Sequence, residues 1–195
     1  MIKCVKCGCH PKRPILLNGL IFCSITHATK YAISKSKQDA KFKKFSVKPR
    51  SQKKAIVQQA FNALRREQEM QWFELRGLRP MCISCGKGLG GDQWACGHLL
   101  SRGERPDLRY DELNTYLQHN FRCNKNLSGD IENYKAGLVT RFGKNKALEI
   151  IKHCETKQDY KEPSDKELYQ MLSDFREQLR ELKKVEKNVE KKSND

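Results

Sequence analysis

The sequence predicts an α-rich α+β protein in which two small zinc-stapled modules are connected by long helical arms. Three observations lead to this fold class. Hydrophobic residues make up 37% of the 195 residues and charged residues 32%, a balance that favours a small core over one large globule. Most of the nine cysteines stand at short metal-ligand spacings and are mixed with histidines. The remaining apolar residues recur mainly at helical spacing.

The charge of the chain indicates its class of partner. The net charge is +16, and neutralised phosphates release condensed counterions, so nucleic acid is the expected partner. Asp39 is the only acidic residue in residues 1–54, where most of this charge lies. No apolar run approaches the roughly 20 residues of a bilayer crossing, and the N-terminus lacks a signal-peptide core. We therefore expect a cytoplasmic protein without a membrane partner, whose odd number of cysteines favours metal over disulfides.

Residues 1–28 are predicted to form an N-terminal zinc-ribbon or treble-clef-like module. Their apolar residues are too few to fold a domain, whereas a structural zinc ion can contribute on the order of 10 kcal/mol. The expected ligands are Cys4, Cys7, Cys23 and His27. Cys9 and His10 are alternatives for one of these positions.

Two helical segments are predicted to follow this module. Residues 29–50 are rich in lysine and form either a solvated linker or a basic helix that tracks phosphates. Pro49 and Ser51 then mark the start of a long amphipathic helix over residues 51–77, with Ser51 as its N-cap. Gly77 ends this helix.

Residues 78–155 are predicted to form a second zinc-stapled module. Two pairs of residues at knuckle spacing can surround zinc tetrahedrally, without the open position of a catalytic ion. These ligands are Cys82, Cys85, His119 and Cys123. Between the pairs, residues 93–98 alternate like a strand, which places Trp94, Cys96 and His98 on one face. Helices are expected over residues 131–142 and 145–154.

Residues 162–195 are predicted to be a C-terminal helix with a charged tail. Ser164 and Glu167 form a capping box at its start. Apolar residues then recur at steps of three and four, at Leu168, Leu172, Phe175, Leu179 and Leu182. This seam either packs back onto the domain or the helix of residues 51–77, or joins two chains in a homodimer.

The central module carries residues suited to phosphodiester hydrolysis. His98 can accept a proton as general base, and Asn114 can orient the His98 ring or brace the loop. The amide oxygen of Asn124 suits a catalytic Mg²⁺ or Mn²⁺ ion, with Asn126 as second choice. The alternatives are a packed or zinc-ligating His98, which would replace His119, and Asn124 as a plain helix cap.

The order His, Asn, Asn, with the first on a strand and the last expected on a helix, resembles an HNH, or ββα-metal, nuclease site. A closer resemblance is to the NinG/Rap family of lambdoid phage recombination endonucleases, and it covers nearly the whole chain. It rests on Lys48 to Ser51, Cys82 to Gly86, Gln93-Trp94, Gly97-His98, Leu108 to Tyr110, Cys123-Asn124 and Ser128-Gly129. The site layout is also similar to that of the phage junction resolvase that places an asparagine directly after its last zinc cysteine.

The resemblance implies a structure-specific DNA endonuclease of the host cell cytoplasm that cuts branched recombination intermediates, such as D-loops and Holliday junctions, with a divalent ion. The basic residues expected to contact DNA are Lys41, Lys43, Lys44, Lys48, Arg50, Arg102 and Arg105. The alternative function is that of a non-catalytic, zinc-dependent DNA-binding accessory protein of recombination.

The chain departs from the family pattern at two places. The second knuckle is His119-x3-Cys123, where the family carries Cys-x2-Cys. Many HNH sites have an acidic ligand directly before the base, and Gly97 stands there in this chain. A second protein ligand for the catalytic ion must then come from elsewhere, and the candidates are Asp92, Glu104, Asp107 and Asp130.

Overall fold

The computed structural model describes residues 2–193, with side chains described up to Lys184. The chain is helix-rich α+β, with two separate two-stranded sheets. It divides into two compact units, Met1–Pro49 and Arg50–Asp195, which are described one at a time. Among the described helices, none combines the length and apolar character needed to cross a membrane.

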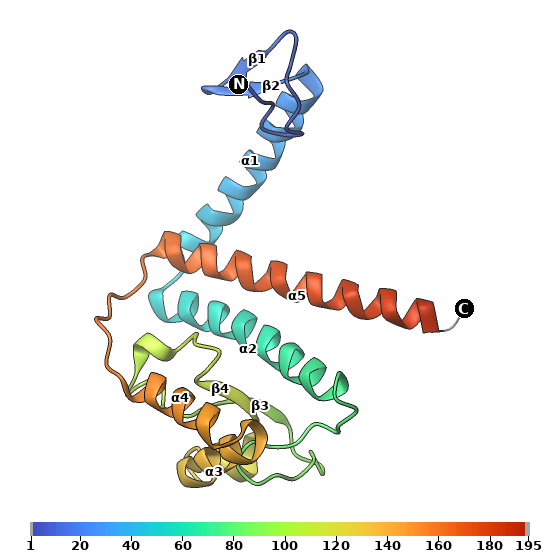
Figure 1. Ribbon diagram of the computed structural model, residues 1–195. Coiled ribbons are helices and arrows are strands. Elements are labelled where there is room, and N and C mark those ends of the chain that lie inside the picture. The colour runs from blue at the N-terminus through green and yellow to red at the C-terminus, as the bar shows by residue number, and fades with distance from the viewer. Residues whose placement is uncertain (1, 194–195) are drawn as a thin grey trace. The chain divides into compact units, whose positions relative to one another are not determined.

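The first unit consists of a hairpin followed by a helix (Figure 1). Strands β1 (Ile15–Leu17) and β2 (Leu20–Phe22) pair antiparallel. The Asn18-Gly19 turn between them has positive φ at both residues, the backbone that a two-residue hairpin requires. Helix α1 (Ile25–Ser46) starts inside the cysteine module. The basic segment predicted as a helix or a linker is therefore a helix that continues directly from the module.

The second unit begins with helix α2 (Arg50–Glu74). Its start at Arg50 places Ser51 inside the first turn, so the prediction of Ser51 as N-cap is wrong. The short hairpin of β3 (Trp94–His98) and β4 (Thr115–His119) follows. The 3-10 turn η1 (Pro106–Leu108) lies in the loop between these strands.

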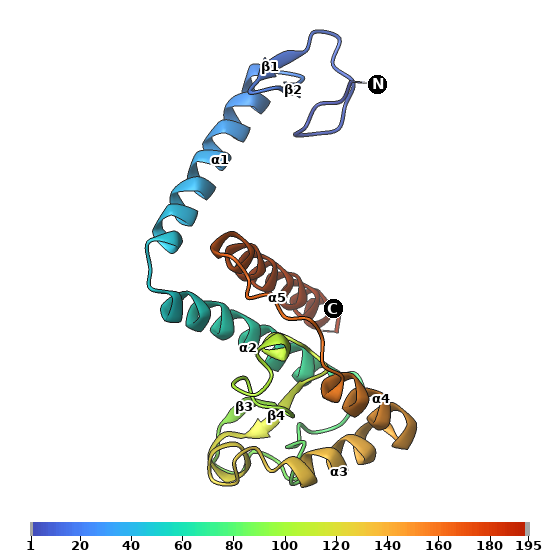
Figure 2. The ribbon, with the colours of Figure 1, turned by 90° about the vertical axis from the view of Figure 1, so that its left-hand side faces the viewer.

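The hairpin lies between α2 on one side and helices α3 (Ile131–Phe142) and α4 (Lys144–Glu155) on the other (Figures 1 and 2). Both helices were predicted, and Gly143 separates them as expected. The core under the hairpin is formed by Ile83, Leu99, Leu108, Tyr116, Tyr134, Leu138, Ala147, Ile150 and Cys154. A buried carboxylate, Glu69 of α2, accepts hydrogen bonds from Leu117 of β4 and Arg141 of α3, which ties the three layers together.

Asn124, which was expected on a helix, does not lie on an α-helix. The chain instead makes one π-helical turn, η2 (Asn120–Lys125), with Asn126 at its C-cap. Gly129 and Asp130 then have positive φ, a conformation that interrupts a right-handed helix. The long helix of this region, α3, therefore begins only after Asp130.

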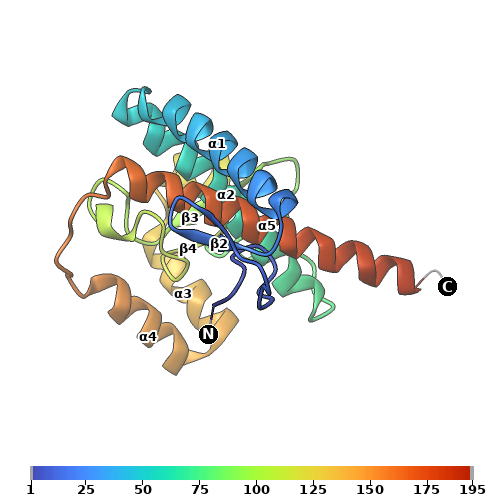
Figure 3. The same ribbon diagram turned by 90° about the horizontal axis from the view of Figure 1, so that it is seen from above.

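Helix α5 (Asp165–Ser193) packs along α2 (Figures 1 and 3). The predicted capping box is confirmed, because Ser164 N donates to Glu167 at 2.6 Å and Glu167 N donates to Ser164 Oγ at 3.3 Å. Leu168 and Leu172 are buried, and the Phe175 ring lies 5.3 Å from that of Phe61 on α2. The apolar seam thus packs within the chain. Side chains of the predicted charged tail beyond Lys184 lie outside the described residues.

Candidate functional site

The four expected ligands of the central zinc module lie together. The ligand atoms of Cys82, Cys85, His119 and Cys123 are all within 4.8 Å of one another. His119 Nε2 lies 2.8 Å from the carbonyl of Gly88. Because a carbonyl can only accept, this contact puts the proton on Nε2 and leaves the Nδ1 lone pair for metal. Three soft thiols and one imidazole fit a structural zinc ion.

The N-terminal cluster differs from the expected ligand set. The sulfur atoms of Cys4, Cys7, Cys9 and Cys23 gather within 4.8 Å of one another. His27 is close by, with Nδ1 3.0 Å from Cys23 Sγ. Cys9 thus lies with the three predicted cysteines, and His27 Nδ1, which is also 3.8 Å from Cys4 Sγ, borders the same group.

His10 stays outside this cluster, because its Nδ1 lies 2.8 Å from the carbonyl of Ile2. The four-cysteine set has the donor chemistry of a structural zinc site.

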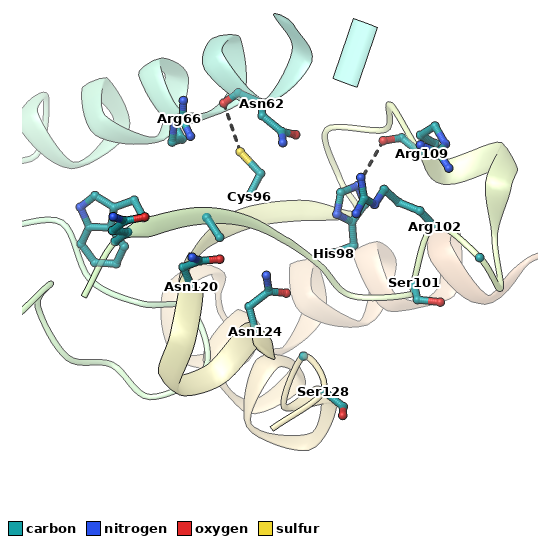
Figure 4. Close-up of a pocket in the computed structure, with 15 residues that line it drawn as sticks. Asn62, Arg66, Cys96, His98, Ser101, Arg102, Arg109, Asn120, Asn124 and Ser128 are labelled. Carbon is teal, nitrogen blue, oxygen red and sulfur yellow. Dashed lines mark hydrogen bonds between the residues drawn. The ribbon is translucent and has the colours of Figure 1, made fainter. Parts of the chain in front are cut away.

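Beside the central cluster is a cavity of about 750 Å³, here called the His98 cavity. Figure 4 shows Asn62 and Arg66 of α2 on one side, Asn120 and Asn124 of η2 on the other, and His98 on β3 between them. The full lining is Asn62, Arg66, Gln93, Trp94, Ala95, Cys96, His98, Ser101, Arg102, Gly103, Arg109, Asn120, Asn124, Ser128 and Gly129. Two of the predicted site residues, His98 and Asn124, therefore meet at one cavity.

His98 is held as a neutral base. Its Nε2 lies 3.1 Å from the carbonyl of Arg109 (Figure 4), so Nε2 carries the proton and Nδ1 the free lone pair. Burial lowers the pKa of His98 to about 4, and the positive charges of Arg102 and Arg109 act in the same direction, against backbone carbonyls that raise it. At neutral pH the imidazole can therefore accept a proton.

Asn114 is fully buried and does not contact His98. Its Oδ1 accepts from Leu100 N at 2.9 Å, and its Nδ2 donates to the carbonyls of Leu100 and Leu108 at 3.0 and 3.3 Å. Of the two roles considered for Asn114, these contacts correspond to bracing the loop. These hydrogen bonds hold Leu100 and Leu108, which belong to the loop that carries Arg102 and Arg109.

The turn η2 joins the central cluster of three cysteines and His119 to the cavity. Cys123 is buried in the cluster, and the next residue, Asn124, lines the cavity. Asp92 anchors the start of this turn by accepting from the backbone N–H groups of Phe121 and Arg122 at 3.1 and 3.0 Å. Asn126 is exposed and is not among the lining residues. Between the two asparagines proposed as metal ligands, only Asn124 faces the cavity.

None of the four acidic candidates for a second metal ligand lines the cavity. Desolvation raises the pKa of Asp92, but its backbone N–H donors outweigh this effect and hold the pKa at about 2. Asp107 pairs with Arg105, and Asp130 accepts from Asn133 at 2.8 Å. Glu104 is exposed and also stays outside the lining. Protein oxygen donors for an ion at this site would therefore come from neutral side chains of the lining, such as Asn124 and Asn120, together with water or phosphate oxygens.

Close packing explains why a glycine precedes His98. A Cβ atom at Gly97 would lie 2.2 Å from Oε1 of the buried Gln118. Gly97 itself is not among the residues that line the cavity, although Ala95 on the same strand face is. An acidic residue at 97 would have to displace Gln118.

The basic residues expected at DNA fall into two groups. Lys41, Lys43 and Lys44 are exposed on α1, Lys48 is half-buried, and Arg102 lines the His98 cavity. Arg50 and Arg105, by contrast, make contacts within the protein. Arg50 pairs with Asp165 at 2.8 Å.

Arg105 is 8% exposed and donates to Asp107 and to the carbonyls of Cys154 and Thr156. It therefore joins the loop to the end of α4, and the prediction that it contacts DNA is corrected for this reason.

Four further polar residues line the cavity without having been predicted from the sequence, namely Asn62, Arg66, Arg109 and Asn120. One pattern could have found the first two. Lys54, Gln58, Asn62 and Arg66 recur at every fourth position of α2, which puts four polar side chains on one face of that helix.

Comparisons with known proteins give a family. The profile described as Bacteriophage Lambda NinG protein matches residues 2–186. Protein ninG of Escherichia phage lambda is 37% identical over 110 residues, which are 56% of this chain and 49% of the relative. Protein ninG of Escherichia phage 933W is 38% identical over 114 residues, 58% of this chain and 52% of the relative. Protein ninG of Salmonella phage P22 is 39% identical over 103 residues, 53% of this chain and 46% of the relative.

The chain thus spans about half the length of the curated relatives it matches. No solved structure matches it. Because the profile match runs through both cysteine clusters and the His98 cavity, the chain belongs to the bacteriophage lambda NinG protein family.

Proposed function

We propose that this NinG-family chain is a DNA endonuclease that uses Mg²⁺ or Mn²⁺ to cut branched recombination intermediates such as D-loops and Holliday junctions. One observation carries the proposal: a neutral imidazole, an amide oxygen and arginine side chains line a single cavity beside a zinc cluster. This combination can bind a phosphodiester and activate water next to it. The resemblance to HNH nucleases, seen in the order His98, Asn114 and Asn124, supports the same chemistry.

In the proposed reaction, His98 Nδ1 takes a proton from water as the water oxygen attacks phosphorus. The phosphorus–oxygen bond to the leaving group breaks, and that oxygen takes up a proton from solvent. Arg102 and Arg109 would hold the phosphate oxygens. Asn124 would hold the divalent ion, which supplies positive charge to the phosphate and the leaving oxygen. The zinc cluster fixes η2, and thereby the position of the Asn124 amide.

The test compares His98→Ala with the wild type on a four-way junction, with and without Mg²⁺ or Mn²⁺. The proposal predicts that junction binding is retained and that cutting falls by about 10²- to 10⁴-fold, the usual contribution of a general base. His153→Ala serves as control, because this histidine pairs with Asp111 outside the His98 cavity. Unchanged cutting by His98→Ala would remove His98 from the reaction.

A second pair of variants tests the metal ligand. Asn124→Ala should cost more cutting activity than Asn126→Ala, and the difference should shrink as the Mn²⁺ concentration is raised. Equal losses in the two variants would contradict the assignment of Asn124.

The alternative function also has an observation in its favour. No carboxylate lines the described cavity, whereas Mg²⁺ sites in proteins usually include one or two. A zinc-dependent accessory protein that binds branched DNA without cutting it would need none. A wild-type chain that binds junctions but leaves them intact in both metals would favour this function.

A further inference from the structure

The His98 cavity continues along helix α2. A second cavity of about 470 Å³ adjoins it and shares Asn62, Arg102 and Arg109 with its lining. The second cavity is lined by Ser51, Lys54, Ala55, Gln58, Gln59, Asn62, Arg102 and Arg109. The two cavities together are called the α2 groove below.

The α2 groove is elongated and polar. One wall is α2 from Ser51 to Arg66, a length of about 22 Å at the helical rise of 1.5 Å per residue. The other wall includes the loop residues Arg102 and Arg109. Along α2, amide side chains such as Gln58 and Gln59 stand between the cations. Within the part of the chain that the structure describes, the lining contains no carboxylate.

Three arginines of the groove have no acidic partner among the residues whose side chains are described. The described residues place no carboxylate within ion-pair distance of Arg66, Arg102 or Arg109. Arg109 donates instead to the neutral amide of Gln58 at 3.5 Å. Burial, together with the like charge of Arg109, lowers the pKa of Arg102. Two neighbouring cations in such a groove attract a polyanion.

We propose that the α2 groove holds one unpaired DNA strand, which runs from the phosphate beside His98 along α2 toward Ser51. Cations on both walls would contact the phosphates of a single backbone without regard to sequence. The interleaved amides can both donate and accept, and an unpaired strand offers base edges of both kinds. In a duplex, the Watson–Crick edges of the bases are already hydrogen-bonded to the complementary strand.

This inference rests on the proposed function and adds the source of branch selectivity to it. Charge alone binds all DNA alike. A groove that accepts one strand over about 22 Å of helix would favour DNA with an unpaired segment next to the cut.

Gln59 allows the groove to be tested away from His98. It is exposed, and it lines the second cavity but not the first. Gln59→Glu places a negative charge in the path of the strand, and glutamate is as good a helix former as glutamine. Gln52→Glu is the matched control, because Gln52 is exposed on the same helix and lies outside the groove lining. Gln59→Lys reverses the sign of the added charge.

The measurement is the fluorescence anisotropy of labelled DNA at low salt without added Mg²⁺ or Mn²⁺, so that it does not depend on cutting. The probes are a blunt duplex and the same duplex with a single-stranded tail. We expect Gln59→Glu to weaken binding of the tailed duplex about fivefold relative to Gln52→Glu, the effect of one unit charge near a phosphate in water. Gln59→Lys should tighten that binding, and the blunt duplex should bind Gln59→Glu and Gln52→Glu equally well, because the two variants have the same net charge.

Equal binding of the tailed duplex by Gln59→Glu and Gln52→Glu would overturn the inference. An equal loss on the blunt and tailed duplexes would also overturn it, since the groove would then hold paired DNA. Failure of the proposed function has a different result, namely a wild-type chain that shows the tail-dependent binding but does not cut with either metal.

Discussion

Replacing Glu69 by alanine should destabilise the second unit by about 4 kcal/mol. The Glu69 side chain is buried, with Oε1 3.2 Å from Arg65 Nη2 and Oε2 2.6 Å from Arg141 Nη1. Its Oε2 also accepts from Leu117 N at 3.2 Å. This single carboxylate therefore connects α2 with β4 and with α3.

The magnitude follows from what the carboxylate leaves behind. Arg65 keeps its hydrogen bond to the Thr115 carbonyl at 2.7 Å. Arg141 keeps only its aromatic neighbours, with its guanidinium carbon 4.1 Å from the centre of the Trp72 ring, and its Nε and Nη2 have no hydrogen-bond partner among the described residues. Removing one partner of a buried ion pair lowers the free energy of unfolding by about 3–5 kcal/mol. Leaving the Leu117 N–H without its acceptor lowers it by about 1–3 kcal/mol. Both costs arise from the same carboxylate and overlap, so we expect a total of about 4 kcal/mol.

Thermal unfolding followed by circular dichroism with zinc present measures this effect. For a unit of this size, about 4 kcal/mol lowers Tm by roughly 10 °C. Glu149→Ala is the control, because Glu149 and Lys146 form an exposed pair with side chains 67% and 57% exposed, and such pairs contribute under about 1 kcal/mol. The double variant Glu69→Ala/Arg141→Met should recover much of the loss, since it removes the stranded charge.

A Tm of Glu69→Ala within about 2 °C of that of Glu149→Ala would refute the reasoning, because both values would then be typical of surface changes. Failure of the double variant to recover would show that the carboxylate acts through Arg65 or the strand amide instead.

Two further predictions concern Gly137 in α3 and His98 in the cavity. Gly137→Ala should destabilise the chain by more than about 1 kcal/mol, because the added Cβ would lie 1.6 Å from the carbonyl oxygen of Ile83. This loss should occur although alanine normally favours a helix over glycine. Gly103→Ala is the control and should be neutral in the same unfolding measurement, because the atom nearest to its added Cβ would be 4.0 Å away. His98 has a folded pKa of about 4 and an unfolded value near 6.5, so its stabilising contribution is complete above pH 6.5 and is lost as pH falls through 4. The stability of the wild type relative to His98→Gln should thus fall by on the order of 2 kcal/mol over that range, and a pH-independent difference would show that burial does not depress this pKa.

Features that depend on near neighbours in the chain could be predicted from the sequence. Helices α3 and α4 follow from apolar periodicity, and the capping box of Ser164 and Glu167 needs only four consecutive residues. The spacing of Cys82 and Cys85 likewise predicts a metal-ligand pair, which the structure brings to His119 and Cys123. The family is also carried by such local motifs.

The candidate site was only half predictable, because its cavity is assembled from separate elements. His98 and Asn124 were found through their motifs. Arg66 stands on a polar face of α2 that the sequence pattern shows, but no local pattern predicts that this face and the loop of Arg109 meet beside His98. The helix expected at Asn124 is only the single turn η2, whose start is held by Asp92, a residue distant in sequence.

The sequence by itself determined most of the helices, the capping box of Ser164 and Glu167, the two metal-ligand clusters in outline and the family. Tertiary structure brought Cys9 into the first cluster beside His27, gave Asn114 hydrogen bonds that brace a loop, and buried Arg105. The tertiary structure also explains why residue 97 is a glycine, because the Gln118 side chain occupies the space that a Cβ atom would need. Periodicity and capping act over a few residues along the chain, whereas ligand choice, burial and cavity lining depend on which distant segments pack together.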